Sequence, residues 1–400
     1  MGSNSELPIV VVGGGLGGLC AATGLGNDGH PVLVLEQAAE IEPIGYGIQL
    51  GPNVFKVFNA LGVSEQVLAA SNLPPALVMP DADSGKTLIE VSLTSPTYKE
   101  RFTHPYVVIH RADLHNVLLE KCQQTPNVEL SVNTTVTGFE EAGDHVKVIC
   151  ADGKIIKAAA LIGADGLKSR IRQALGHKDE LVPNGYVAHR TLIDMKDVPK
   201  ELAHTEDVVL WAGPGYHVVH YPLRHSSIFN IVSVFRNPAT GHGENPEGYA
   251  KDLEQVYANA QPVLKKLLSM MNLDRRWVLS DRDPIRNWTR GRVTLLGDAA
   301  HPAYQSFAQG AGMAIEDAGC LVKILQQTNY DYEKAFIDYE KARVTRAARL
   351  VLESRLLWEF YHAEGLARDV RNQEISERTP DDTYRCLNWV WSGDPLLRSA

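Results

Sequence analysis

The first 36 residues combine two apolar strands, a helix of small residues and a glycine-rich turn, and this combination constrains the fold most. Pro8–Val12 is expected to form a buried strand, Gly17–Asn27 a helix and Pro31–Glu36 a second buried strand. The turn after the first strand reads Gly13-x-Gly15-x-x-Gly18. A strand, a helix and a strand over about 30 residues, with this turn at the first junction, predict a Rossmann-like α/β fold with a parallel sheet.

The glycines of this turn each have a physical task in binding a dinucleotide. Gly13 permits the tight turn, Gly15 lets the backbone approach a pyrophosphate, and Gly18 lets helix and strand pack closely. Leu16 lies inside the same turn and is counted with the binding residues. Glu36 ends the second strand, where a carboxylate accepts hydrogen bonds from the adenosine ribose.

A second glycine-rich motif lies near residue 300. The apolar segment Val293–Gly297 predicts a strand, Asp298 follows it, and residues 308–317 read as a loop that opens a helix. The carboxylate could bind a ribitol or ribose hydroxyl, and the N–H groups at the helix start could face negative charge. A third strand, which ends in Gly163-Ala164-Asp165-Gly166, offers another carboxylate after small residues.

Composition excludes several other classes of protein. The 39 basic and 48 acidic residues give a formal charge of −9, which argues against nucleic acid as the main partner. The five cysteines are scattered without disulfide or metal-ligand spacing, so we expect reduced thiols and no metal. No apolar stretch approaches the length of a membrane span. We therefore expect a cytoplasmic protein.

Together these motifs resemble those of the group A flavoprotein monooxygenases, the family of para-hydroxybenzoate and salicylate hydroxylases. The resemblance covers about residues 8–350 and includes Ser169 and Arg172 after the third motif, and His301-Pro302 after Asp298. It implies a GR2-type FAD-binding domain, discontinuous over residues 1–180 and 285–345, with a small β-meander. It further implies an inserted antiparallel sheet over residues 181–284 that binds the substrate, and a C-terminal helical tail over residues 346–400.

The resemblance also implies FAD as the cofactor and gives roles to individual residues. Arg111 would reach the flavin phosphate or ribityl region, Asp165 would serve FAD pyrophosphate and NAD(P)H, and Asp298 would bind ribitol. The glycines of the first motif would hold the pyrophosphate and Glu36 the adenosine ribose. The flavin N1–C2=O edge would face backbone of the second motif, which includes Gly310, Ala311, Gly312 and Met313.

The chemistry that the resemblance implies is hydroxylation of a phenolic aromatic acid. NADH or NADPH would reduce FAD, and O2 would then form a flavin C4a-hydroperoxide that transfers one oxygen atom to the ring. A phenol reacts best as phenolate, so the protein should supply a group that accepts its proton. Water must be excluded to prevent leakage of hydrogen peroxide.

Candidate substrate residues come from a strand and from the loop of the second motif. Alternation along Tyr216–Pro222 places His217 and Tyr221 on one face of the strand, and histidine is suited to accept a proton near neutral pH. Gln305 stands where many relatives have proline and offers a donor and an acceptor. Tyr106 is a candidate for the carboxylate end of the substrate, although ordinary packing explains it better, whereas a structural histidine on a half-buried strand explains His217 equally well.

His217, Tyr221 and Gln305 are similar to the site set of 3-hydroxybenzoate 6-hydroxylases. This similarity implies conversion of 3-hydroxybenzoate into 2,5-dihydroxybenzoate. Decarboxylating relatives, salicylate 1-hydroxylase and 6-hydroxynicotinate 3-monooxygenase, remain alternatives, as does a non-oxygenating FAD-dependent oxidoreductase. An NAD-dependent dehydrogenase would leave Asp165 and Asp298 without a task. A protein that binds FAD without catalysis is a further alternative. The sequence is compatible with a homodimer or a monomer.

Overall fold

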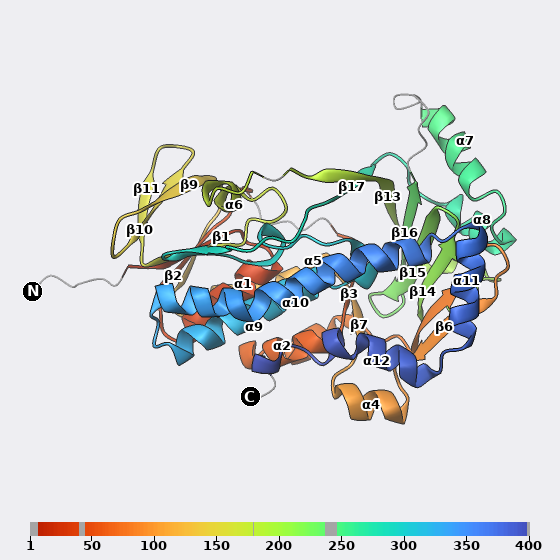
Figure 1. Ribbon diagram of the computed structural model, residues 1–400, viewed down its shortest axis with the longest axis horizontal. Coiled ribbons are helices and arrows are strands. Elements are labelled where there is room, and N and C mark those ends of the chain that lie inside the picture. Colours follow the sequence, from red (N-terminus) through yellow and green to blue (C-terminus); the bar gives the residue numbers. More distant parts are fainter. Residues whose placement is uncertain (1–6, 40–44, 179, 237–245, 398–400) are drawn as a thin grey trace, which may run out of the picture.

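The computed structural model describes residues 7–39, 45–178, 180–236 and 246–397. Figure 1 shows two main β-sheets, one at each end of the long axis, with a long helix, α10 (Tyr332–Tyr361), running between them. The predicted segments that extend to residues 1–6 and 398–400 lie partly outside the described residues.

The first sheet is the parallel sheet that the N-terminal motif predicts. Its strand order is β18-β19-β12-β1-β2-β8, and all neighbours pair in parallel except β18 with β19. The strands are β1 (Ile9–Val12), β2 (Val32–Leu35), β8 (Val128–Ser131), β12 (Ala160–Gly163), β18 (Thr289–Arg290) and β19 (Val293–Leu295). Helix α1 (Leu16–Asn27) packs against α5 (Arg111–Gln124) and α9 (Gly310–Gln327).

Close backbone contacts explain the glycines at the first turn. A Cβ on Gly18 would lie 2.1 Å from the carbonyl oxygen of Gly13. Gly13 itself has a φ of +110°, which is outside the range that other residues adopt easily. The turn therefore requires glycine at both positions, as the sequence predicts.

The second sheet has seven strands in the order β17-β13-β16-β15-β14-β5-β6. Five come from the segment expected to form it: β13 (Val182–Asp194), β14 (Val208–Gly213), β15 (Tyr216–Leu223), β16 (Ile228–Arg236) and β17 (Trp277–Asp281). The other two, β5 (Ala76–Pro80) and β6 (Thr87–Ser92), come from the first third of the chain, and β5 pairs with β14 in parallel. The sheet is therefore larger than the expected insertion and is not wholly antiparallel.

Two three-stranded sheets complete the β structure. One is the expected meander, β9 (Val136–Glu141), β10 (Val146–Cys150) and β11 (Ile155–Ala158). The alternating apolar residues of 128–132 are also typical of a meander strand, but this interpretation is wrong, because β8 there pairs in parallel with β2. The other sheet joins β3 (Gly47–Leu50), β7 (Val107–His110) and β4 (Ser71–Asn72).

The remaining helices cover the sheets and form the C-terminal part of the chain. The shorter ones are α2 (Phe55–Leu61), α3 (Ser64–Ala69), α4 (Pro96–Phe102), α6 (Arg170–Ala174), α7 (Pro246–Val256) and α8 (Pro262–Leu268). After α10 come α11 (Gly365–Ser376) and α12 (Pro380–Trp391), which begins at a capping box of Thr379 and Asp382. The expected tail thus contains a regular helix, which packs against α4 and β6 (Figure 1) and against residues 52–54. Among the described residues, every helix is too short or too polar to cross a membrane.

Candidate active site

One large cavity, of about 1060 Å³, lies between the two main sheets. Its wall is formed by the N-termini of α1 and α9, by one face of the seven-stranded sheet, and by α10 and α12. The predicted site residues that line it are Gly15, Leu16, Gly18, Tyr106, Arg111, His217, Tyr221, Asp298, Gln305, Gly310 and Ala311. Segments far apart in the sequence thus meet in a single space.

The backbone at the start of α1 borders open space. A Cβ built on Gly15 would meet no atom within 4 Å, and Gly15 lines the cavity. Glu36 lies behind this turn, where its carboxylate accepts hydrogen bonds from the N–H of Gly14 at 2.8 Å and of Ala38 at 2.9 Å. In this structure Glu36 therefore holds the glycine turn in place, and a role toward ribose stays a prediction.

The start of α9 approaches the same space from the other side. Gly310 and Ala311 line the cavity, and a Cβ on Gly310 would also meet no atom within 4 Å. Gly312 and Met313 do not line it. The N–H of Met313 donates to the carbonyl of Gln309 at 2.8 Å, so this amide is not available to a ligand. Met313 is thus the first residue of α9 whose N–H makes a complete helical bond, and its role toward the flavin stays a prediction.

Asp298 lies in the cavity wall within a short 3-10 helix, Gly297–Ala299. Desolvation by the surrounding protein raises the pKa of its carboxyl, against the opposing effects of His301 and Arg111. The neighbouring backbone is held by Arg172, whose guanidinium donates to the carbonyls of Ala299 at 3.1 Å and Ala300 at 2.8 Å.

A buried charge cluster fixes the same loop from the α9 side. Asp317 accepts hydrogen bonds from the N–H of Gly297 at 3.0 Å and from Arg343 at 2.7 Å, and it pairs with His301 at 2.5 Å. Arg343 also pairs with Glu316 at 3.0 Å and Asp394 at 2.6 Å. Although burial alone would raise it, His301 and Arg343 lower the pKa of Asp317 to about 2.

Asp165 lies outside the cavity wall and caps a helix. Its carboxylate accepts from the Ser169 hydroxyl at 2.6 Å and from the N–H groups of Arg170 at 2.7 Å and Ile171 at 3.3 Å. Burial raises its pKa despite these bonds. Its neighbours Ala164 and Gly166 line the cavity, so in this structure the motif contributes small residues to the wall while Asp165 shapes the turn.

His217 and Tyr221 project from β15 into the cavity, together with Val219. The alternation predicted for this strand is therefore correct. His217 is 2 % exposed, and its Nδ1 lies 2.8 Å from Nε2 of His362 at the end of α10. Burial lowers the pKa of His217 to about 3, so the ring is neutral at physiological pH, and the same burial opposes its protonation.

Gln305 is oriented by an arginine that sequence reasoning did not identify. Arg190 of β13 donates from its guanidinium to Oε1 of Gln305 at 3.0 Å, and both line the cavity. With its oxygen engaged in this way, Gln305 presents its amide nitrogen as the group that can donate to a ligand. Tyr46 lies beneath the guanidinium, 6.0 Å from its central carbon to the ring centre.

Two buried tyrosines, Tyr106 and Tyr221, place polar hydroxyl groups in the part of the cavity next to the seven-stranded sheet. The Tyr106 hydroxyl donates to Oε1 of Gln49 at 2.6 Å, and both residues line the cavity together with Tyr221. Burial raises the pKa of Tyr106 and of Tyr221 well above the ordinary value, so both hydroxyls stay protonated. Neutral hydroxyls are suitable donors to a carboxylate.

Arg190, Gln49, His362 and α12 are the parts of this site that sequence reasoning missed. Helix α12 contributes Leu387 and Trp391 to the wall, although it lies at the far end of the chain. Tryptophans near the chain end gave a weak signal of packing there, but no local pattern marks Arg190 or His362 as cavity residues.

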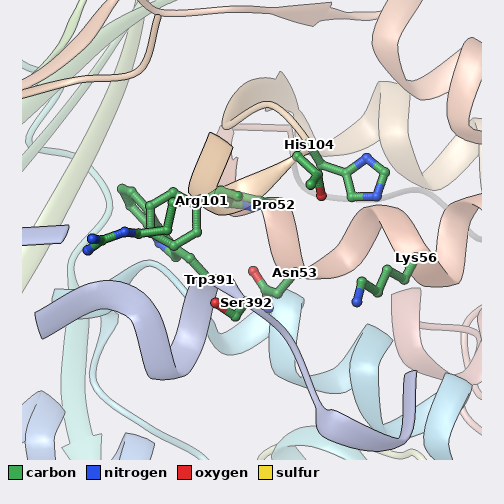
Figure 2. A pocket seen from close by; sticks show the side chains of 9 residues that line it. Pro52, Asn53, Lys56, Arg101, His104, Trp391 and Ser392 are labelled. Carbon is green, nitrogen blue, oxygen red and sulfur yellow. The ribbon is translucent and has the colours of Figure 1, made fainter. Parts of the chain in front are cut away.

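A smaller hollow of about 260 Å³ lies between α2, α4 and the end of α12. Figure 2 shows Lys56, Arg101 and His104 around it, with Trp391 shared between the two cavities. Arg101 pairs with Asp381 at 2.8 Å. None of the predicted site residues lines this hollow.

Comparison with known proteins decides the family. Residues 6–354 match the model of a family described as FAD binding domain. The chain belongs to this family. The match spans both glycine motifs and the substrate-side strands, so the resemblance found from the sequence is confirmed.

Individual relatives and solved structures give a finer comparison. A 3-hydroxybenzoate 6-hydroxylase of Polaromonas naphthalenivorans is 42 % identical over 388 residues, which cover 97 % of this chain and 96 % of the relative. A 6-hydroxynicotinate 3-monooxygenase of Bordetella bronchiseptica is 32 % identical, covering 86 % of this chain and 89 % of the relative. The crystal structure of Klebsiella pneumoniae HpxO with FAD and uric acid superimposes with a TM-score of 0.84 at 28 % identity, covering 96 % of each chain.

Proposed function

We propose that this protein is an FAD-dependent monooxygenase that converts 3-hydroxybenzoate into 2,5-dihydroxybenzoate with NAD(P)H and O2. The observation that carries the proposal is the single cavity that joins the starts of α1 and α9 with His217, Tyr221 and Gln305. Similarity to the 3-hydroxybenzoate 6-hydroxylase of Polaromonas naphthalenivorans supports the choice of substrate.

The residues at the α1 and α9 ends of the cavity fit FAD. Gly15 and Gly310 leave open space where a side chain would obstruct a ligand, and both lie at a helix N-terminus that favours negative charge. Asp298 and Arg111 line the space between them. When bound there, FAD would supply the redox chemistry that uses NAD(P)H and O2 to deliver one oxygen atom to the aromatic ring.

The substrate-side residues suit a phenolic acid. His217 lines the cavity and would accept the phenolic proton. Loss of that proton raises the electron density of the substrate ring at the carbon para to the hydroxyl. That carbon is position 6 of 3-hydroxybenzoate, and its hydroxylation gives 2,5-dihydroxybenzoate. The protonated hydroxyl of Tyr221 would donate to the carboxylate, and that of Tyr106 would do so on leaving Gln49. The Gln305 amide would donate to an oxygen of the substrate.

A decarboxylating hydroxylase is the second candidate, because a 6-hydroxynicotinate 3-monooxygenase shares 32 % identity with this chain. Decarboxylation requires attack at the carbon that bears the carboxylate, which changes the product and releases carbon dioxide. A non-oxygenating oxidoreductase would give no hydroxylated product at all.

A substrate panel tests the proposal. The purified yellow protein is incubated with NADH or NADPH and with 3-hydroxybenzoate, 2-hydroxybenzoate, 4-hydroxybenzoate or 6-hydroxynicotinate, and products are identified by mass spectrometry. We expect 3-hydroxybenzoate to stimulate cofactor oxidation most and to yield 2,5-dihydroxybenzoate. Higher product yield from another acid would overturn the substrate assignment, and consumption of cofactor without any hydroxylated product would overturn the monooxygenase.

A further inference from the structure

The described part of the chain contains one histidine pair deep inside the protein. Nδ1 of His217 and Nε2 of His362 lie 2.8 Å apart, and the two rings stack with centroids 4.9 Å apart at 27°. His217 is 2 % exposed and His362 is 3 % exposed. A hydrogen bond between two neutral imidazoles requires that one nitrogen carries the proton and the other does not.

Packing holds His362 firmly in this position. Tyr186 of β13 stacks on its ring at 4.7 Å, and Trp358, one turn earlier on α10, contacts it edge-on at 4.8 Å. Its backbone N–H donates to the carbonyl of Trp358 at 3.2 Å. A ring held on two sides can keep its Nε2 directed at His217 without a further hydrogen bond, and its Nδ1 has no partner within the described residues.

The remaining nitrogen of His217 belongs to the cavity. The ring lines the cavity wall, and no hydrogen bond among the described residues engages its Nε2. We propose that His362 is a positioning residue for His217: it accepts the Nδ1–H of His217, which leaves the Nε2 lone pair as the base that takes the substrate's phenolic proton. This inference rests on the proposed function, because it assigns the phenol as the proton donor.

The proton transfer itself is simple. The phenolic O–H bond breaks, its electron pair stays on oxygen as phenolate, and an N–H bond forms at Nε2 of His217. No electrons are exchanged between redox partners. The positive charge that appears on His217 is shared with His362 through the Nδ1–H···Nε2 bond.

The surroundings of His362 act on that charge in opposite directions. His362 is the C-cap of α10, a helix of 30 residues, and the carboxyl end of a helix stabilises a cation. The charged and titratable groups that face the pair are Tyr186, Tyr361 and Arg236. Burial opposes a charge on His362 most, and Arg236 opposes it too, although Arg236 also pairs with exposed Glu364 at 3.3 Å.

Two substitutions at His362 separate hydrogen bonding from packing. His362→Phe keeps an aromatic ring between Tyr186 and Trp358 but has no acceptor. His362→Gln gives up the ring but keeps an amide oxygen that can accept from His217. A purely structural role predicts that the phenylalanine variant is the milder change, and the positioning role predicts the opposite.

The readouts are product formed per NADH oxidised and the pH at which bound 3-hydroxybenzoate becomes phenolate, followed by its ultraviolet absorption. For His362→Phe we expect product per NADH to fall at least about tenfold, and phenolate formation to move at least about one pH unit higher, since one unit is a tenfold change in equilibrium. For His362→Gln we expect both values within about threefold of the wild type, and FAD content unchanged in both variants. Wild-type values for His362→Phe, or equal losses in the two variants, would overturn the proposal.

A measurement on the unaltered holoenzyme covers the case in which a variant does not fold. Nitrogen-15 spectra of histidine-labelled protein, with His217 assigned through His217→Ala, distinguish a protonated Nδ1 from a protonated Nε2. We expect Nδ1–H and a bare Nε2 on His217 without substrate, and Nε2–H there would refute the positioning role. If the wild type hydroxylates no phenolic acid, the proposed function fails, whereas this spectrum still decides how the histidine pair is protonated.

Discussion

Removal of the Arg343 guanidinium should weaken both the fold and the loop that carries Asp298. Arg343 is fully buried and pairs with Glu316, Asp317 and Asp394. Arg343→Met leaves these buried carboxylates without their shared cation, and breaking one side of a buried ion pair costs about 3–5 kcal/mol.

The structure favours the lower end of that range. Glu316 keeps Arg346 at 2.8 Å, Asp317 keeps His301 and the N–H of Gly297, and Asp394 keeps the N–H of Leu396 at 2.8 Å. We therefore expect a loss of about 3 kcal/mol. With an unfolding entropy of about 2 cal/mol/K per residue over 400 residues, this corresponds to a drop in Tm of about 4 °C.

The assay is thermal unfolding of the holoprotein, combined with FAD retained after gel filtration. Lys341→Met is the matched control, because Lys341 lies on the same helix, is 72 % exposed and pairs with Asp338 at 3.8 Å. Surface pairs of this kind contribute about 0–1 kcal/mol, so the control should unfold near the wild-type temperature and keep its FAD. Equal unfolding temperatures and equal FAD content for the two variants would refute the anchoring role of the buried cluster.

Three further predictions concern the glycine turn, the arginine behind Gln305 and acid stability. Gly15→Ala should keep the Tm of the FAD-free protein, because its Cβ would meet no atom, but should bind FAD more weakly in a fluorescence titration. Gly18→Ala should instead lower the yield of folded protein, because its Cβ would lie 2.1 Å from a backbone oxygen. Arg190→Leu should lower product per NADH and raise hydrogen peroxide about tenfold, as expected for loss of a charge-assisted hydrogen bond of about 1.5–3 kcal/mol to Gln305; unchanged peroxide would contradict this. Because the pKa of Asp317 is lower in the folded than in the unfolded protein, its ionised carboxylate stabilises the fold above about pH 4, and this stabilisation is lost as the pH falls toward about 2. The urea midpoint should therefore fall less steeply between about pH 4 and 2 in Asp317→Asn than in the wild type.

Local patterns predicted the parts of the site that local chemistry determines. The turn after β1 requires glycine at position 18 because the backbone of Gly13 lies too close for a side chain. The alternation of side chains along β15 follows from strand geometry. His217 and Tyr221 could therefore be placed on one face before the fold was known.

The parts that sequence reasoning missed depend on contacts between distant segments. Arg190 meets Gln305 across 115 residues, and His217 meets His362 across 145 residues. Similarly, β8 joins the parallel sheet and β5 joins the second sheet because of their neighbours in space, not because of any local pattern. A short apolar segment is compatible with either sheet, and only tertiary packing decides between them.

Labelled dioxygen gives the most direct test of the proposed hydroxylation. The purified holoprotein is supplied with NADH, 3-hydroxybenzoate and ¹⁸O₂, and the aromatic product is analysed by mass spectrometry. The arrangement of His217, Gln305 and the two helix starts around one cavity predicts 2,5-dihydroxybenzoate that carries a single ¹⁸O atom. Product without the label, or oxidation of NADH to hydrogen peroxide alone, would contradict it.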